Sequence, residues 1–185
     1  MASDEKTKKI LDKAKELFLH HGYAKVTLSD IAEQSGYSRP TVYQVFPNKE
    51  EIFKTLLEQW AEEALQKIRQ GMNPDAKCSD QLRFAMTIWI IEPYQLLKTS
   101  PQAAELLDCS YGFAKNVVRN NYRGFEALIV QILNRDKRDR IFNSQKMAQL
   151  ISFSLRGFKA HTEDVTQLKR LVDDLIELVV YPEKS

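Results

Sequence analysis

The stretch TLSDIAEQSGYSRPTVYQVFPNKEEIF, residues 27–53, holds closely spaced signals for starting and ending helices. Three of its side chains suit the N-cap position, where an oxygen accepts a hydrogen bond from the first helical turn: Thr27, Ser38 and Asn48. Gly36 permits a tight turn, and Pro40 is tolerated in the first turn of a helix. We therefore predict two short helices joined near Gly36, followed by a longer helix that begins at Asn48.

Two short helices that meet at a tight turn form a helix-turn-helix, whose second helix can enter the major groove of DNA. Two side-chain sizes agree with this geometry. Ala32 is small where the helices would cross, and Val42 would fill the angle between them. The pattern favours a DNA-binding helix-turn-helix domain over residues 1–47.

The remaining sequence also predicts helices, because apolar residues recur at helical spacing with almost no strict alternation. The chain is therefore expected to be all-α, with a larger helical domain over residues 48–185. Pro93 should end or bend a helix that begins near Asp80. The helices expected outside the two short ones cover residues 4–21, 48–68, 80–91, 101–107, 110–133, 144–160 and 166–181.

The composition is compatible with several classes of soluble protein and does not identify one of them. The 185 residues are 43% hydrophobic and carry a formal charge of +2, which neither requires nor forbids nucleic acid as a partner. Cys78 and Cys109 lie far apart, with no second ligand at metal-binding spacing. Because catalytic motifs are also missing, we expect no enzyme activity, no metal and no cofactor. The charged start and the lack of a long apolar run predict a cytoplasmic protein without membrane contact.

A continuous pattern runs through about the first quarter of the chain: Gly22-Tyr23, Thr27-Leu28-Ser29-Asp30-Ile31-Ala32, Gly36-Tyr37-Ser38, Val42-Tyr43 and Phe46-Pro47-Asn48-Lys49-Glu50-Glu51-Ile52-Phe53. Through this pattern, residues 11–53 resemble the DNA-binding domain of the TetR family of transcriptional repressors. Val45 and Pro40 depart from the family's commoner residues. The resemblance implies an N-terminal three-helix domain joined to a larger helical domain for ligand binding and dimerisation.

The resemblance also implies that Thr27 and Lys49 grip phosphates from helix starts and that Tyr43 contacts another phosphate. Exposed amide groups and the helix dipole favour anions at such starts. The base edges would be read by outward-facing side chains: Arg39, Thr41 and Gln44. The predicted DNA-binding set is Thr27, Ser38, Arg39, Thr41, Tyr43, Gln44 and Lys49. Tyr43 could instead pack, Thr27 could be a cap alone, and Lys49 could be a solvated lysine.

By the same resemblance, helices of the larger domain surround an inducer pocket lined by Trp89, Tyr94, Tyr111, Phe113, Asn116, Asn120 and Phe125. These residues could equally form plain core or lie exposed, although polar groups on apolar helices are costly to bury unpaired. The last two helices carry apolar stripes wide enough for two contacts, so we expect a four-helix bundle between two copies. The predicted dimerisation residues are Leu150, Ile151, Leu155, Phe158, Leu168, Leu171, Val172, Leu175, Ile176 and Val179.

These observations predict a ligand-responsive transcriptional regulator, expected to act as a repressor. It would bind a palindromic operator in double-stranded DNA as a homodimer and be released by a small-molecule inducer of unknown identity. The rival hypothesis is a helical small-molecule-binding protein or enzyme whose N-terminal helices dock a protein partner. Steep salt dependence of duplex binding would distinguish the two hypotheses.

Overall fold

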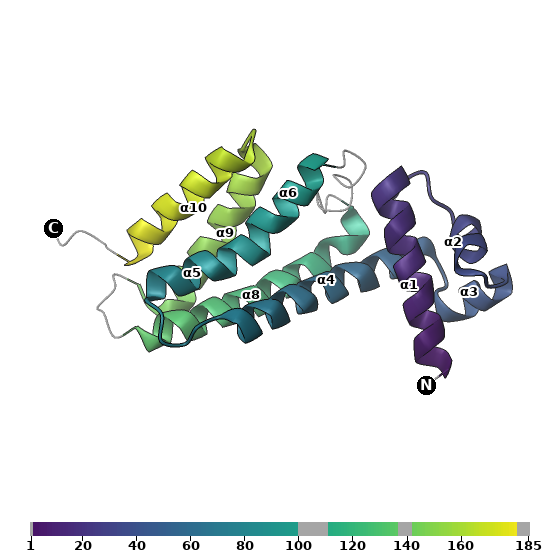
Figure 1. Cartoon of the computed structure of the whole chain (residues 1–185), viewed down its shortest axis with the longest axis horizontal. Helices are drawn as coiled ribbons and strands as arrows, with labels where there is room; N and C mark the ends of the chain where they lie inside the picture. Colours follow the sequence, from purple (N-terminus) through teal and green to yellow (C-terminus); the bar gives the residue numbers. More distant parts are fainter. Residues whose placement is uncertain (1, 100–110, 137–141, 181–185) are drawn as a thin grey trace. The chain divides into compact units, whose positions relative to one another are not determined.

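The computed structural model describes residues 2–99, 111–136 and 142–180, and these residues are helical with short connections and no strand (Figure 1). The expected helix over residues 101–107 lies outside the described residues, as does Cys109. Within the described part of the chain, no helix is both long and apolar enough to cross a membrane. The all-α prediction is confirmed for the described residues.

The first helices follow the sequence signals closely. Helix α1 covers Ala2–His21 and ends at Gly22, whose φ of 82° is a left-handed conformation that favours glycine. Helix α2 covers Leu28–Ser35, and α3 covers Arg39–Val45. The predicted starts and ends of the two short helices are therefore confirmed.

Helix α4 covers Lys49–Gly71, and the side chain of Asn48 accepts a hydrogen bond from the Glu51 amide at 2.9 Å. Helix α5 covers Cys78–Met86 and continues through a π-helical turn, η1, at Thr87–Ile91 into α6 at Glu92–Thr99. In that turn the Glu92 amide donates to the Thr87 carbonyl, one residue further back than in an α-helix. Pro93 lacks an amide proton, and the wider turn lets the helix continue past it.

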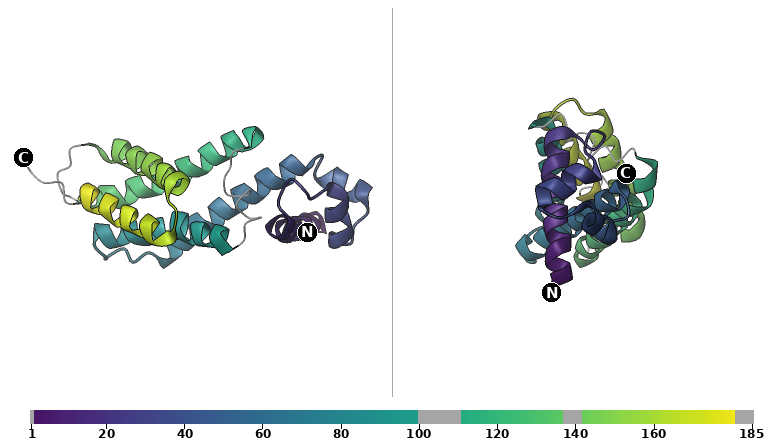
Figure 2. Two further views of the ribbon diagram at one scale, coloured as in Figure 1. Left: turned by 90° about the horizontal axis from the view of Figure 1, so that it is seen from above. Right: turned by 90° about the vertical axis from the view of Figure 1, so that its right-hand side faces the viewer.

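The C-terminal half begins with a short 3-10 helix, η3, at Gly112–Ala114, which leads into α8 at Lys115–Arg135. Helix α9 covers Ser144–His161, and Asn143 caps it by accepting from the Lys146 amide at 2.9 Å. Helix α10 covers Val165–Val180. Helices α9 and α10 pack against each other, as Figure 1 and the left view of Figure 2 show.

The chain divides into two compact units, each with its own core. The first consists of Met1–Trp60 and Leu96–Val118, and the second of Ala61–Gln95 and Arg119–Ser185. The first core gathers apolar residues of α1 to α3, the start of α4 and residues 111–118. The second core gathers residues from the rest of α4, α5, η1, α8, α9 and α10. The boundary expected after residue 47 stays a prediction.

Candidate nucleic-acid interface

The start of α2 is held by a reciprocal pair of hydrogen bonds between Thr27 and Asp30. The Asp30 amide donates to Thr27 Oγ1 at 3.2 Å, while the Thr27 amide and hydroxyl each donate to Asp30 Oδ2 at 2.8 Å. The donation from Thr27 lowers the pKa of Asp30 below its ordinary value. A phosphate at Thr27 would therefore compete with this carboxylate for the hydroxyl proton.

The turn between α2 and α3 depends on Gly36, whose φ of 71° lies in the left-handed region. Its amide donates to the Glu33 carbonyl at 3.1 Å, and the Tyr37 amide donates to the Ala32 carbonyl at 3.1 Å. This is the pairing of a helix end closed by glycine. Ala32 and Val42 are both buried, as their sizes predict.

The start of α3 is held by Ser38, which accepts a hydrogen bond from the Thr41 amide at 3.3 Å. The two hydroxyls also lie 2.8 Å apart in a mutual hydrogen bond. Pro40 occupies the first turn, where a missing amide proton costs nothing. The hydrogen bonds between Ser38 and Thr41 therefore hold the first turn of α3 in place in the absence of DNA.

The outward face of α3 consists of polar side chains that the first unit leaves uncovered. Arg39 and Gln44 are exposed, and Tyr43 keeps 53% of its surface accessible. Phe46, at the end of the same helix, is buried in the core. Because Arg39 and Gln44 carry groups that match base edges, this face has the chemistry to contact a DNA groove.

Lys49 lies beside the start of α2, but its ammonium is engaged by the protein. Its Nζ donates to the carbonyls of Tyr23 and Val26, each at 2.7 Å, and to that of Ala24 at 3.4 Å. It also lies 4.2 Å from the centroid of the Tyr23 ring. An ammonium has three N–H donors, and all three are accounted for. Phosphate contact by Lys49 stays a prediction, and the structure shows it tying α4 to the segment between α1 and α2.

The predicted ligand-binding residues fall into separate groups. Trp89 stacks on Phe125, with ring centroids 4.6 Å apart, and the Tyr94 hydroxyl donates to the Thr162 carbonyl at 2.8 Å. Tyr111 stacks on Phe113, and both lie against the rings of Tyr23 and Phe53 in the first unit. The two predicted asparagines are exposed: Asn116 and Asn120. Tyr111 and Phe113 thus belong to a different core from Trp89, Tyr94 and Phe125.

The predicted dimerisation residues are mostly covered by the subunit itself. Six are buried in the second core: Ile151, Leu155, Leu168, Val172, Ile176 and Val179. Phe158, Leu171 and Leu175 are half-buried, whereas Leu150 is exposed. Because these six residues pack inward against the subunit's own core, they have no accessible area left for a partner. Two large apolar side chains outside the predicted set, Phe153 and Leu178, are 65% and 73% accessible.

Burial sets the proton affinity of one more side chain in the first unit. Tyr23 packs against Phe18 and Phe53, and its burial, with smaller contributions from Glu50 and Tyr111, raises the pKa of its phenol to about 12. The folded unit therefore stabilises the neutral, protonated form of the Tyr23 phenol.

Comparison with known proteins agrees with this geometry. Residues 10–56 match the family model described as "Bacterial regulatory proteins, tetR family". The chain is 37% identical over 65 residues to an uncharacterized HTH-type transcriptional regulator, YfiR of Bacillus subtilis, covering 35% of this chain and 32% of that protein. It is 44% identical over 50 residues to the HTH-type transcriptional repressor ComR of Escherichia coli, covering 27% and 24% of the two chains. The matched segments thus span about a third or less of these relatives' length.

The similarity in fold extends over nearly the whole chain. The crystal structure of the transcriptional regulator FadR from Bacillus subtilis, in complex with stearoyl-CoA, superposes with a TM-score of 0.69 at 18% identity. The superposition covers 96% of this chain and 99% of that one. At this identity the likeness shows the fold alone, whereas the match to the tetR family model is confined to residues 10–56. The N-terminal segment of this chain, residues 10–56, thus has the sequence of the DNA-binding domain of the tetR family of bacterial regulatory proteins.

Proposed function

We propose that this protein is a ligand-responsive transcriptional regulator that binds operator DNA through the exposed face of α3. The observation that carries the proposal is the exposure of Arg39, Tyr43 and Gln44 on α3, a helix within the segment that matches the tetR family model. A guanidinium can pair with the edge of a guanine in the major groove, and an amide with adenine. The Tyr43 hydroxyl would contact a phosphate and position the helix without reading sequence. The proposal assigns the protein no catalytic activity.

Two copies would present two such helices to successive major grooves of a palindrome. We place the interface between copies on the outer faces of α9 and α10. Leu150 and Phe153 on α9 and Leu178 on α10 are exposed, and Leu171 on α10 is half-buried. Large exposed apolar side chains on two neighbouring helices are typical of a four-helix interface.

A small molecule that binds the second unit would control DNA affinity. The ligand releases DNA only if its affinity is higher for the DNA-free conformation than for the DNA-binding conformation. A coupling free energy of about 1–3 kcal/mol between the two sites changes the affinity for DNA by about 5- to 150-fold. FadR, with the same fold, binds stearoyl-CoA, which supports an apolar effector site in this architecture. The relative ComR is named as a repressor, which supports the proposal that operator binding by this protein represses transcription. We place this activity in the cytoplasm.

A selection of duplexes bound from a random pool tests DNA binding and symmetry together. We expect enrichment of a palindrome whose half-sites are separated by a whole number of helical turns, about 10 base pairs each. Affinity for the selected site should fall steeply with salt, because phosphate contacts release counterions. Enrichment of a single asymmetric site would contradict the dimer, and the absence of any salt-dependent duplex binding would contradict the function.

A further inference from the structure

An exposed lysine of α1 lies beside the turn that leads into α3. The Nζ of Lys9 lies 5.3 Å from the centroid of the Tyr37 ring. A β-carbon at Gly36 would lie 3.8 Å from the same Nζ, so the ammonium lies against the turn itself. The next residue of α1, Ile10, is fully buried in the core of the first unit and holds this part of the helix in place. The charge of Lys9 is thus positioned beside Tyr37, two residues before Arg39.

The hydrogen-bond donors of Lys9 have no acceptor in the described part of the chain. Glu5 and Asp12 lie one helical turn away on α1, yet neither forms an ion pair with Lys9. The face of a ring attracts an ammonium without providing an oxygen acceptor, so three N–H donors stay available. Lys49 differs, because its ammonium donates to three backbone carbonyls. Of these two lysines, Lys9 is the one whose donors can reach a phosphate without breaking a contact within the protein.

The position of this ammonium suits a wall of the major groove. In a helix-turn-helix, the N-terminal residues of the second helix contact base edges. A helix with its side chains is about 10–12 Å wide and the groove is about 12 Å wide, so groups at the flank of the helix face phosphates. Lys9 lies at such a flank, beside the turn that precedes Arg39. An ammonium that reaches a phosphate neutralises its charge and releases a counterion.

We propose that Lys9 contacts a DNA phosphate next to the base-reading residues of α3, with the Tyr37 ring holding its side chain in position for this contact. The contact, which rests on the proposed function, lies outside the DNA-binding set predicted from the sequence. A phosphate contact positions a helix but reads no bases. Lys9 therefore adds affinity for every duplex and leaves the choice of operator to Arg39 and Gln44.

Lys9→Gln removes the charge and keeps a polar side chain at this position. Fluorescence anisotropy with labelled duplexes measures affinity from about 50 to about 200 mM salt. We expect the slope of log affinity against log salt concentration to become shallower by about 0.9 for each subunit on the DNA. Over this fourfold range, the ratio of the affinities of the unchanged protein and the variant should shrink about 3.5-fold for each subunit. The selected operator and a random-sequence duplex should lose affinity by the same factor, and the midpoint of urea denaturation should not move.

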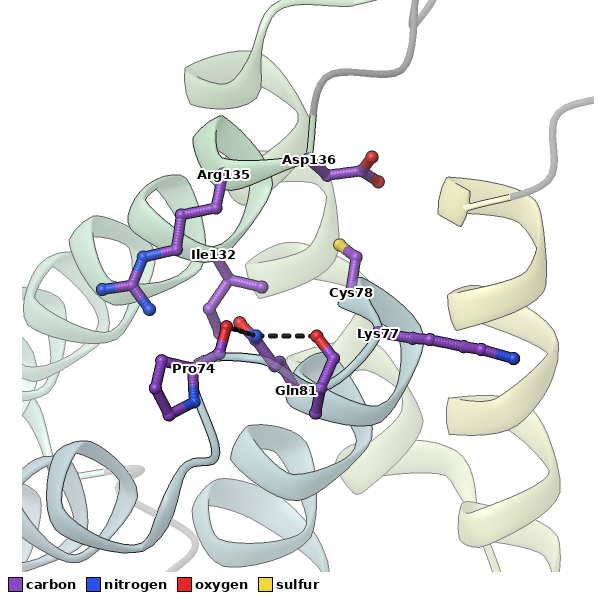
Figure 3. Close-up of a pocket in the computed structure, with 8 residues that line it drawn as sticks. Pro74, Lys77, Cys78, Gln81, Ile132, Arg135 and Asp136 are labelled. Carbon is purple, nitrogen blue, oxygen red and sulfur yellow. Dashed lines mark hydrogen bonds between the residues drawn. The ribbon is translucent and has the colours of Figure 1, made fainter.

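Lys8→Gln is the matched control on the same helix. Lys8 is exposed and lies seven residues before Lys15, whose ammonium lies over the Trp60 ring of α4, so Lys8 shares a different face of α1. Lys77→Gln controls for net charge, because Lys77 lies at a pocket of the second unit, and Figure 3 shows its side chain extending away from the other residues drawn. Neither control should change the slope. Lys9→Arg should keep it, because a guanidinium also binds phosphate.

A salt slope for Lys9→Gln equal to that of the unchanged protein would overturn the phosphate contact. An equal loss of slope for Lys8→Gln would also overturn it, because the position beside Tyr37 would then make no difference. A lower midpoint of urea denaturation with an unchanged slope would assign Lys9 to the stability of the turn instead. Operator binding with an unchanged slope contradicts this contact alone, whereas the absence of salt-dependent duplex binding by the unchanged protein contradicts the proposed function as well.

Discussion

Lys49→Met tests whether this lysine stabilises the first unit or contacts DNA. The substitution keeps an unbranched, mostly apolar side chain of nearly the same length and removes the ammonium. Its hydrogen bonds to the carbonyls of Tyr23 and Val26 are short and charge-assisted. Such bonds contribute about 1.5–3 kcal/mol each, and the contact with the Tyr23 ring adds about 0.5–1 kcal/mol.

Lys49 is only half-buried, so solvent replaces part of what is lost. We therefore expect the free energy of unfolding to fall by about 2–4 kcal/mol. Urea denaturation followed by far-ultraviolet circular dichroism measures this loss. Lys25→Met is the matched control, because Lys25 lies in the segment between α1 and α2 that Lys49 contacts, but its side chain is exposed. The control should change stability by less than about 0.5 kcal/mol.

The dependence of DNA affinity on salt separates the two roles of Lys49. A lysine that neutralises a phosphate contributes about 0.9 to the slope of log affinity against log salt concentration. If its three donors stay on the carbonyls, Lys49→Met leaves this slope unchanged, although affinity falls with the loss of order at the start of α2. A slope that decreases by about 0.9, with unchanged stability, would refute the reasoning and restore Lys49 as a phosphate contact.

Three other outcomes follow from the structure. Arg39→Gln should cost about 1–3 kcal/mol of binding mainly on the selected operator, whereas Tyr43→Phe should weaken selected and random duplexes by the same factor; equal patterns for both would contradict their separate roles. Because the pKa of Tyr23 is raised to about 12 from 10.0, the stability it contributes is complete below pH 10 and is lost as pH rises toward 12. Tyr23→Phe should remove that part of the alkaline loss in denaturation curves, and an unchanged pH profile would contradict the cause given. Leu178→Glu should shift the protein toward monomer in sedimentation experiments, while Gln145→Glu on the exposed surface should not; a persistent dimer would place the interface elsewhere.

The helices of the N-terminal domain could be predicted from the sequence because local interactions determine where they begin and end. The caps at Thr27, Ser38 and Asn48 each join residues three apart, so the chain carries both partners within one short segment. The turn at Gly36 likewise depends on the conformational freedom of a single residue. Helix starts, the tight turn and the exposed face of α3 follow from these signals.

Sequence periodicity also identified the apolar stripes of α9 and α10, but it did not reveal what covers them. Val172 and Ile176 pack into the subunit's own core, whereas Leu178 on the same helix is left exposed. Periodicity shows that one face of a helix is apolar, but a face packed into the core and a face at an interface between subunits are both apolar. Only the packing of neighbouring helices decides between these two uses.

The sequence alone determined where the helices of the N-terminal domain begin, which residues form the helix-turn-helix and that the described residues are helical, but it did not predict α6 or the start of α8 at Lys115. The tertiary structure decided the partners of Lys49, the division of the predicted pocket aromatics between two cores, and the position of Lys9 beside the Tyr37 ring. The first set depends on interactions within about four residues, which the order of amino acids records directly. The second depends on contacts between residues far apart in the chain, and these exist only once the helices have packed.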